Sequence, residues 1–395
     1  MYRQKLAKSL YMDFPCEVMS LNNEKKEPNR CELSGSCDTN VVPNLHHNST
    51  TLVPNCQSLE RELTEKWNKK KSASEPLVLS FLRLGLDKRA ERCADCGTLL
   101  EFTPVMAAGG ESPQGLPPAG TQQPTKWHLY KANFCRDRLC PMCSWRRSYK
   151  IFGQVSQIMD LIAKDYDFLF LTLTVPNVTA SELSNKLDEL QKGWYKLSNY
   201  NRVKSVLKGF FKALEITYNQ VSDTYHPHYH IVLAVPKCYL TSRGYIQRDE
   251  WLRLWQRAMK DETITQVDIR RAKGKVKGSE ISVEGAAASK ALASAIAEIA
   301  KYAVKSSDYI FKDDELTDRV VGCLADVLTN RRLCAFGGCF AEAHKQLQLD
   351  DAEDGDLIHL DGEIRADLAT QIYRFEWSCG AYKLKEIVTK TRKSE

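Results

Sequence analysis

The sequence has no hydrophobic run long enough to cross a lipid bilayer. Its longest apolar stretch, residues 168–175, covers eight residues and already includes two threonines, whereas a membrane-spanning helix needs about 18 or more. The first 18 residues also lack the apolar core of a secretory signal. Neither sign of charge predominates, because 56 basic and 50 acidic residues leave a net charge of only +6. We therefore expect a cytoplasmic protein that does not enter a membrane.

The overall composition is that of an ordinary globular protein. With 43% hydrophobic, 27% charged and 9% aromatic residues, it excludes wholesale disorder and collagen-like repeats. A chain of 395 residues is long enough for two to three domains of roughly 150 residues each. Residues 1–75 mix Asn, Ser, Pro and Lys without periodicity, which predicts a loosely ordered region. Residues 107–124 are rich in Gly, Pro and Gln, which predicts an exposed loop insertion.

Hydrophobic periodicity predicts a mixed order of helices and strands. Strands are expected at residues 168–175, 210–218, 228–235 and 266–271, and helices at 146–163, 181–197, 249–260, 286–305 and 318–328. The second and third strands are typical of a hairpin whose turn centres near Ser222. A Thr-x-x-Glu start at Thr179 predicts a capping box on the helix that follows. Antiparallel pairing favours an α+β fold over a doubly wound α/β fold.

Charge is unevenly distributed along the chain. Residues 126–150 contain seven basic side chains and one acidic one, while residues 341–367 contain two basic and nine acidic ones. A basic stretch beside a cysteine cluster suits contact with nucleic-acid phosphates. An ordinary solvated basic face is the alternative.

Fourteen cysteines are many for a cytoplasmic chain, in which thiols more often bind metal or pack than form disulfides. Cys93 and Cys96 form one C-x-x-C pair, and Cys140 and Cys143 form another. This spacing lets four thiolates surround one Zn²⁺ in a tetrahedron at about 2.3 Å, so we expect a closed, structural zinc site. Cys135, five residues before Cys140, is a possible replacement for one of the four. Buried free thiols or a redox pair are the alternatives.

A second cluster places three of the eight histidines within five residues, directly before an apolar strand. Because strand side chains alternate, His228 and His230 point to one face and Tyr229 to the other. Two imidazoles with one more ligand can hold a catalytic divalent ion and leave positions open for a phosphate oxygen. Glu215, on the partner strand of the hairpin, is the expected third ligand. Surface histidines without a metal are the alternative.

A glutamate and a tyrosine share one face of the predicted helix 286–305. Glu298 and Tyr302 are four residues apart, and Lys305 follows three residues later. A tyrosine hydroxyl can attack a phosphodiester to give a phosphotyrosine when a cation neutralises the developing charge. A carboxylate one turn away can instead activate water. Taken alone the pair is unspecific, because this spacing is common on amphipathic helices.

Together these segments resemble the rolling-circle plasmid replication initiators, the single-tyrosine branch of the HUH endonucleases. The resemblance covers about residues 93–358 and follows the family's order of motifs. Four segments carry this order: Phe134-Cys-Arg-Asp-Arg-Leu-Cys-Pro-Met-Cys143, Phe170-Leu-Thr-Leu-Thr-Val-Pro-Asn177, the histidine motif at 226–230, and Glu298-x-x-x-Tyr302 with Lys305 and Asp308. A fifth, from Arg331 to Phe340, resembles the family's C-terminal stretch. Any one motif is weak, but four in order are highly specific.

The resemblance implies an α+β domain with a central antiparallel sheet, the HUH histidines on a middle strand and flanking helices, plus a zinc-knuckle region. It implies that His228 and His230 bind Mg or Mn, that Tyr302 takes the 5′-phosphate and that Glu298 activates water at termination. The expected activity is that of a site-specific nickase and strand transferase. The expected partners are single-stranded or hairpin plasmid origin DNA, a host helicase and a single-strand-binding protein.

The chain is accordingly expected to have four parts. Residues 1–75 form the loosely ordered region and residues 76–150 the cysteine-rich zinc-binding region. Residues 151–315 form the endonuclease domain, and residues 316–395 a C-terminal helical region with an acidic tail.

Other functions stay open. The string from His226 to Val232 also fits the histidine-triad pattern of small nucleotide hydrolases, in which histidine is the nucleophile and no metal is needed. That interpretation explains neither the cysteines nor the tyrosine helix. A zinc-dependent DNA-binding regulator would bind without cutting. A transposase or mobilisation relaxase of the same endonuclease class would cut a different target.

Overall fold

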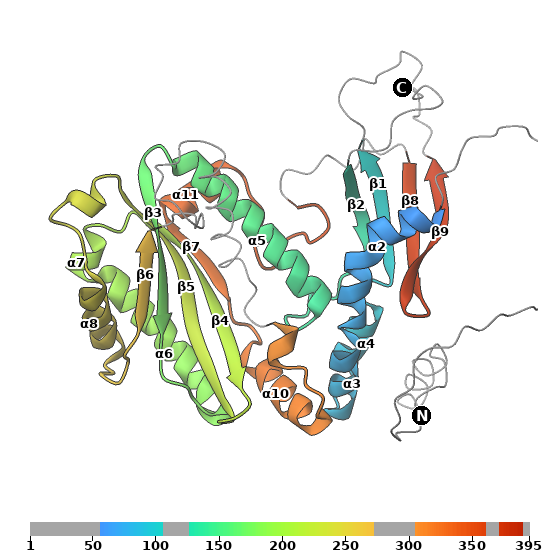
Figure 1. Cartoon of the computed structure of the whole chain (residues 1–395), viewed down its shortest axis with the longest axis horizontal. Coiled ribbons are helices and arrows are strands. Elements are labelled where there is room, and N and C mark those ends of the chain that lie inside the picture. The colour runs from blue at the N-terminus through green and yellow to red at the C-terminus, as the bar shows by residue number, and fades with distance from the viewer. Residues whose placement is uncertain (1–55, 106–125, 272–304, 361–370, 390–395) are drawn as a thin grey trace, which may run out of the picture.

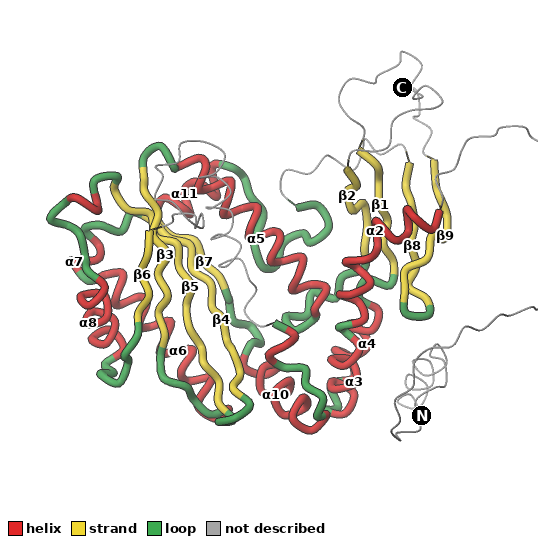
Figure 2. The backbone as a smooth tube through the Cα atoms, viewed as in Figure 1, coloured by secondary structure: helices red, strands yellow, loops and turns green. Residues whose placement is uncertain are grey.

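The chain folds into two antiparallel sheets with helices packed around them (Figures 1 and 2). This computed structural model describes residues 56–105, 126–271, 305–360 and 371–389. Within these ranges all paired strands run antiparallel and helices flank both sheets, so the predicted α+β class is confirmed. The predicted loop at 107–124 and nearly all of the predicted helix 286–305 lie outside the described residues.

The larger sheet has five strands in the order β6-β3-β5-β4-β7. They are β3 (Tyr166–Thr174), β4 (Gly209–Asn219), β5 (Thr224–Pro236), β6 (Val267–Arg271) and β7 (Cys334–Gly338). β4 and β5 form the predicted hairpin, in which Asn219 pairs with Thr224 and Glu215 pairs directly with His228. β5, which carries the histidine motif, is the middle strand of this sheet.

Helices cover one face of the larger sheet. α6 (Ala180–Asn199) packs on the face of β5 that carries Tyr229, whose hydroxyl donates to Gln191 of α6 at 3.1 Å. α8 (Arg248–Met259) packs against α6 and β6, and the short α7 (Asn201–Lys204) follows α6. The predicted capping box is present, because the Thr179 backbone N–H donates to the Glu182 carboxylate at 2.9 Å. The histidine side chains therefore project from the opposite face.

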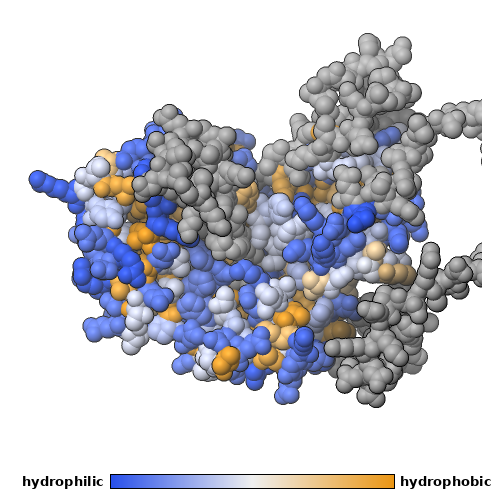
Figure 3. All heavy atoms as spheres, in the orientation of Figure 1, coloured by the Kyte–Doolittle hydropathy of each residue, from blue (hydrophilic) through white to orange (hydrophobic). Residues whose placement is uncertain are grey.

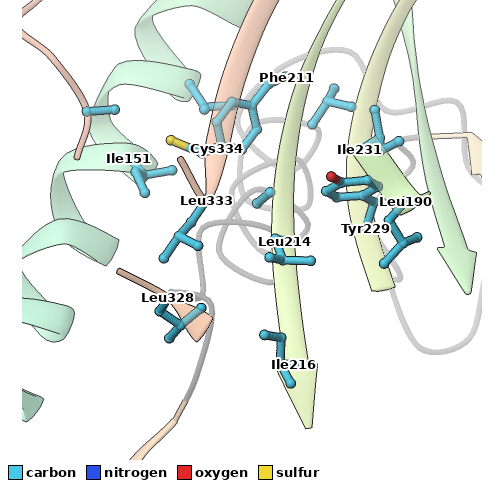
Figure 4. Packing of buried hydrophobic residues seen from close by; sticks show 14 of the residues in the cluster. Ile151, Leu190, Phe211, Leu214, Ile216, Tyr229, Ile231, Leu328, Leu333 and Cys334 are labelled. Atoms are coloured by element: carbon cyan, nitrogen blue, oxygen red, sulfur yellow. The ribbon is translucent and has the colours of Figure 1, made fainter. Parts of the chain in front are cut away.

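On that opposite face, α5 (Pro141–Ile162) and α11 (Cys339–Gln346) pack near the β4–β7 edge. Figure 4 shows Ile151 of α5 near Leu333 and Cys334, with Phe211 of β4 beside them, and all four are buried. Gly338 ends β7 with a φ of 55°, and a Cβ there would lie 2.2 Å from a backbone carbonyl oxygen. Only glycine permits this close approach at the sheet edge.

The smaller sheet has four strands in the order β2-β1-β8-β9. They are β1 (Leu99–Val105), β2 (Lys126–Ala132), β8 (Gln371–Ser378) and β9 (Ala381–Thr389). α2 (Cys56–Ser72) packs against β9, and α3 (Glu75–Arg83) and α4 (Asp87–Asp95) pack on each other below the sheet in the view of Figure 1. Trp67 of α2 makes edge-to-face contacts with Phe102 of β1 and Trp145 of α5, with ring centroids 5.7 and 4.8 Å apart. These aromatic contacts join the smaller sheet to α5.

Both ends of the described chain differ from the sequence prediction. α2 lies inside residues 1–75, where loose order is expected. Residues 316–395, expected to be helical, contain most of α10 (Asp314–Val327) and α11 but also β7, β8 and β9. β8 pairs with β1 and β7 with β4, both distant in sequence. The sequence prediction missed all three strands, although β8 and β9, of eight and nine residues, form a local hairpin.

The basic stretch 126–150 binds the acidic segment 350–358. Arg138 Nη1 donates to Glu353 Oε2 at 2.6 Å, and Lys150 Nζ donates to Asp350 Oδ2 at 2.7 Å. Further hydrogen bonds to backbone carbonyls of the same segment come from Arg136, Arg146 and Arg147. Contact of this stretch with nucleic-acid phosphates stays a prediction. The interpretation as a solvated face is wrong for Arg146, Arg147 and Lys150, which are buried. Charge complementarity inside the fold accounts for them instead.

Where Figure 3 displays described residues, their surface shows no single large apolar patch. Figure 3 shows hydrophobic residues there in small groups among hydrophilic ones. Across the described ranges, the helices are all too short or too polar to span a bilayer.

Candidate active site

Three side chains of the β4–β5 hairpin converge on one point. His230 Nε2 lies 2.9 Å from Glu215 Oε2, and His228 Nε2 lies 3.5 Å from the same oxygen. One possible ligand atom from each residue lies within 4.8 Å of the other two. Strand alternation put the two histidines on one face and the hairpin register put Glu215 opposite His228, both as predicted.

Two further contacts fix the orientation of the imidazoles. His228 Nδ1 lies 3.1 Å from the backbone carbonyl oxygen of His226. Because a carbonyl oxygen only accepts, Nδ1 carries the proton, and Nε2 remains the atom that can bind a cation. His230 Nδ1 lies 3.2 Å from Thr172 Oγ1 on β3. In histidine metal sites, the ring nitrogen that does not bind the metal typically has a hydrogen-bond partner that orients the imidazole.

Glu215 is the charged centre of this cluster. It is 5% exposed, and its Oε1 accepts a hydrogen bond from Lys305 Nζ at 2.8 Å. Burial by itself would raise the pKa of Glu215. The hydrogen bonds from His228, His230 and Lys305 outweigh burial and hold this pKa well below its ordinary value. The carboxylate is therefore ionised at neutral pH and suited to a cation.

The donor set fits a divalent cation. Two imidazole nitrogens and one carboxylate oxygen come from one side, so an ion bound to them would keep open positions for substrate oxygens. Mg²⁺ prefers ligand sets made entirely of oxygen. The two imidazole nitrogens make this donor set less suited to Mg²⁺ than a set made only of oxygens would be.

An open pocket of about 600 Å³ lies next to the cluster. It is lined by Asn177, Thr217, Tyr218, Asn219, Gln220, Val221 and His226. The ring of His226 stacks on that of His228, with centroids 5.0 Å apart, and so links pocket and cluster. Burial lowers the pKa of His226, and the neighbouring His228 adds to this effect. The pocket thus presents amides, hydroxyls and aromatic rings beside the candidate metal site.

The predicted nucleophile Tyr302 and the predicted water-activating Glu298 lie outside the described residues. The described chain begins again at Lys305, whose side chain already contacts Glu215. A short 3₁₀ helix, η2 (Ser306–Asp308), follows, and the Asp308 carboxylate accepts from the Lys305 backbone N–H at 3.3 Å. The segment that follows Tyr302 in sequence therefore starts at the candidate metal site.

A second cluster brings together the thiols of Cys96, Cys135, Cys140 and Cys143. One Sγ from each lies within 4.8 Å of the others. Cys96 Sγ is 3.6 Å from both Cys140 Sγ and Cys143 Sγ, and Cys135 Sγ is 3.6 Å from Cys143 Sγ. A tetrahedral Zn²⁺ with bonds of about 2.3 Å needs sulfur atoms about 3.8 Å apart. The four thiols thus have the spacing that a structural zinc ion requires.

Backbone N–H groups point at these sulfur atoms. The N–H of Cys135 lies 3.4 Å from Cys96 Sγ, and the N–H of Arg136 lies 3.2 Å from Cys143 Sγ. A hydrogen bond between the thiols of Cys135 and Cys140 is the main cause that lowers the pKa of Cys140. A hydrogen bond between the thiols of Cys135 and Cys143 is the main cause that raises the pKa of Cys143. Four neighbouring thiolates are therefore disfavoured in the metal-free cluster, whereas a bound cation would stabilise them.

Cys135 belongs to the four-thiol group, whereas the predicted ligand Cys93 lies outside it. Cys93 is buried in the last turn of α4, with its Sγ 3.6 Å from Cys135 Sγ. Cys135 precedes a tight turn in which Arg136 has a φ of 60°, and this turn aims the thiol and adjacent N–H groups inward. The geometry thus favours the replacement that the sequence left open.

Sequence reasoning missed two contacts that complete the histidine cluster. Lys305 stood out for its spacing from Tyr302, but its ion pair with Glu215 spans 90 residues. The contact between Thr172 and His230 spans 58 residues. The only available signal was that Lys305 and Thr172 each belong to one of the motifs, since single-chain periodicity does not report contacts between distant elements.

Comparisons with known proteins agree with these motifs. Residues 126–383 match the family described as Replication protein. A protein named Protein rep from Bacillus amyloliquefaciens is 40% identical over 282 residues, which cover 70% of this chain and 78% of that protein. Protein rep from Streptococcus pneumoniae serotype 2 is 35% identical over 306 residues, covering 76% of this chain and 85% of that protein. No solved structure matches significantly. The chain therefore belongs to the Replication protein family, in agreement with its resemblance to plasmid replication initiators.

Proposed function

We propose that this chain initiates rolling-circle plasmid replication by nicking and rejoining single-stranded or hairpin origin DNA through a 5′-phosphotyrosine intermediate. The proposal rests on the convergence of His228, His230 and Glu215 on the β4–β5 hairpin. Family membership supports the replication role. A host helicase and a single-strand-binding protein are the proposed partners, and the cytoplasm is the proposed compartment.

The proposed reaction is a transesterification at phosphorus. A divalent cation held by His228, His230 and Glu215 would polarise the scissile phosphodiester and offset the charge that develops on its oxygens. Tyr302 attacks the phosphorus, so that a bond to its phenolic oxygen forms while the bond to the 3′-oxygen of the preceding nucleotide breaks. The phenol loses its proton and the departing 3′-oxygen gains one, which balances the step. The phosphotyrosine conserves the bond energy, so strands can be rejoined without ATP.

Glu298 is assigned to the end of the replication round. Its carboxylate accepts a proton from a water molecule, whose oxygen then attacks the phosphotyrosine phosphorus. The bond between phosphorus and the phenolic oxygen of Tyr302 breaks, the phenolic oxygen takes up the proton held by Glu298, and a 5′-phosphate remains on the DNA. Because water forms no lasting adduct, hydrolysis releases the strand.

The covalent chain supports Tyr302 as the nucleophile. Three peptide units connect it to Lys305, so the two Cα atoms are at most about 11 Å apart. Lys305 Nζ lies 2.8 Å from Glu215 Oε1 at the candidate metal site. The phenol is thus tethered to the cluster that would hold the phosphate.

The pocket beside His226 is assigned to a nucleotide adjacent to the scissile phosphate. Its amide groups suit the hydrogen-bonding edges of an unpaired base, and Tyr218 offers an aromatic face for stacking. The four-thiol cluster is assigned a structural zinc ion, because four sulfur ligands leave no position open for a substrate.

The experiment uses purified protein, Mn²⁺ and tiled single-stranded oligonucleotides that cover the origin of the plasmid encoding it. We expect a covalent protein–DNA adduct that survives denaturing electrophoresis and is absent from the Tyr302→Phe variant. Tyr195→Phe is the control, since Tyr195 lies on α6 and is 69% exposed. An adduct that persists in Tyr302→Phe would contradict the assignment of the nucleophile.

The same experiment separates the alternatives. A histidine-triad hydrolase would form no tyrosine adduct and would hydrolyse nucleotides without added metal. A DNA-binding regulator would retain the oligonucleotides without cutting them. A transposase or relaxase would form the adduct on transposon ends or a transfer origin rather than on the replication origin.

A further inference from the structure

The segment that follows the predicted nucleophile is fastened to the four-thiol cluster as well as to the histidine cluster. Tyr309 is 1% exposed, and its hydroxyl donates a hydrogen bond to the backbone carbonyl of Leu139. Leu139 directly precedes Cys140, one of the four clustered thiols. Four residues before Tyr309, Lys305 binds Glu215 at 2.8 Å. Residues 305–309, the connecting segment, therefore join the two clusters.

The connecting segment is held in shape by its own hydrogen bonds. The Asp308 N–H donates to the Lys305 carbonyl at 2.8 Å, and the Ile310 N–H donates to the Ser306 carbonyl at 2.9 Å. The Asp308 carboxylate also accepts from the Lys305 N–H at 3.3 Å. A short turn closed in this way has little freedom to extend, so the position of Tyr309 limits the position of Lys305.

We propose that Tyr309 is a positioning residue for strand cleavage. Its hydrogen bond to Leu139 fixes the connecting segment relative to the four-thiol cluster, and the segment in turn places Lys305, three residues after Tyr302 in sequence, at Glu215. The inference rests on the nicking function proposed above. It gives the zinc site a role in the rate of the chemical step in addition to its role in folding.

The size of the expected effect follows from the geometry of attack. A nucleophile must approach the phosphorus in line with the leaving oxygen, and a displacement of about 1 Å can lower the rate about 100-fold. Affinity for single-stranded DNA generally depends on contacts with several nucleotides. Loss of the Tyr309 anchor should therefore change the rate of cleavage far more than the affinity for the oligonucleotide.

The chain contains a matched control for this contact. Tyr382 of β9 is 2% exposed, and its hydroxyl donates to the backbone carbonyl of Gly97. Gly97 directly follows Cys96, another of the clustered thiols. Both tyrosines therefore bind a carbonyl next to a cluster cysteine. Tyr382, however, lies in the smaller sheet, where it pairs with Trp377 of β8, and not in the connecting segment.

The test compares full-length wild type, Tyr309→Phe and Tyr382→Phe, each loaded with zinc and supplied with Mn²⁺. The rate of adduct formation at saturating oligonucleotide, the oligonucleotide Kd, the zinc content and the melting temperature are measured. We expect Tyr309→Phe to react about tenfold more slowly or worse, with Kd and zinc content matching those of Tyr382→Phe. Equal rates for the two variants would overturn the proposal.

A second measurement uses only the wild-type protein, so its outcome does not depend on whether a variant folds. Exchange of the zinc for the larger Cd²⁺, followed by excess Mn²⁺, expands the four-thiol cluster in the wild-type protein. The adduct should then form more slowly at unchanged oligonucleotide Kd, and an unchanged rate would contradict the proposal. If the proposed nicking function itself were wrong, the wild-type protein would form no adduct at all. An adduct abolished by Tyr302→Phe but formed at the wild-type rate by Tyr309→Phe would refute this inference alone.

Discussion

Arg138 Nη1 donates a 2.6 Å hydrogen bond to Oε2 of Glu353, which is 1% exposed. The other oxygen of this carboxylate accepts from the backbone N–H groups of Leu333 and Cys334, at 2.8 Å each. Arg138 belongs to the loop between Cys135 and Cys140, and Cys334 begins β7, which pairs with β4. One buried carboxylate thus joins the loop of the four-thiol cluster to the sheet that carries the histidine cluster.

Replacement of Glu353 should be strongly destabilising. Glu353→Ala removes the acceptor for one guanidinium and two backbone N–H groups in a buried place, which costs about 3–5 kcal/mol of unfolding free energy. Asp354→Ala is the matched control, because Asp354 is the exposed neighbour and a surface change of this kind shifts stability by about 0.5 kcal/mol or less. Urea unfolding measures both. Equal losses of unfolding free energy in the two variants would show that the Glu353 carboxylate does not join the Cys135–Cys140 loop to the larger sheet.

The zinc assignment predicts about one zinc ion per chain by elemental analysis, and loss of folding when Cys140 becomes Ser. The geometry adds a sharper contrast between two neighbouring cysteines. Cys135→Ser should lose the ion, because Cys135 belongs to the four-thiol group, whereas Cys93→Ser should retain it. The reverse pattern would return Cys93 to the ligand set. A soluble, folded wild type without zinc would refute the site altogether.

The hydroxyl of Thr172 on β3 should strengthen the binding of metal by the histidine cluster. Thr172→Val removes the partner of His230 Nδ1, and loss of such an outer contact typically weakens metal binding about 10- to 100-fold. Thr174→Val is the control two residues along the same strand, since its hydroxyl donates to the backbone carbonyl of Gln266 instead. Mn²⁺ titration followed by calorimetry measures both. Similar affinities in the two variants would count against an orienting role for Thr172.

The low pKa of Glu215 predicts how stability responds to acid in the metal-free protein. A folded-state pKa below the unfolded value of about 4.5 means that the ionised carboxylate stabilises the fold at higher pH. This contribution is lost as the pH falls below 4.5 toward the folded-state pKa. The stability advantage of wild type over Glu215→Gln should therefore shrink on acidification below pH 4.5, as measured by urea unfolding at several pH values. An advantage that grows there would mean that Glu215 is not held ionised.

The histidine cluster was predictable from sequence because its geometry is local. A hairpin with its turn near Ser222 fixes which residue of β4 faces His228, and strand alternation fixes the shared face of His228 and His230. The capping box at Thr179 was equally local. Each of these features follows from residues within one element or one hairpin.

Contacts between distant segments were not predictable in this way. The basic stretch 126–150 looked like a binding surface because its partner, the acidic segment 350–358, lies some 200 residues later. The choice of Cys135 over Cys93 depends on a turn at Arg136 with positive φ, which the sequence does not mark with a glycine. In both cases tertiary structure, not local pattern, decides which groups meet.

The central claim is tested most directly by a crystal structure of the Tyr302→Phe variant with Mn²⁺ and an oligonucleotide that spans the nick site. We predict an ion within about 2.3 Å of His228, His230 and Glu215, a phosphate oxygen on the same ion, and the ring of residue 302 directed at that phosphorus. An ion bound elsewhere, or a ring that points away from a phosphate held at the histidine cluster, would contradict the account.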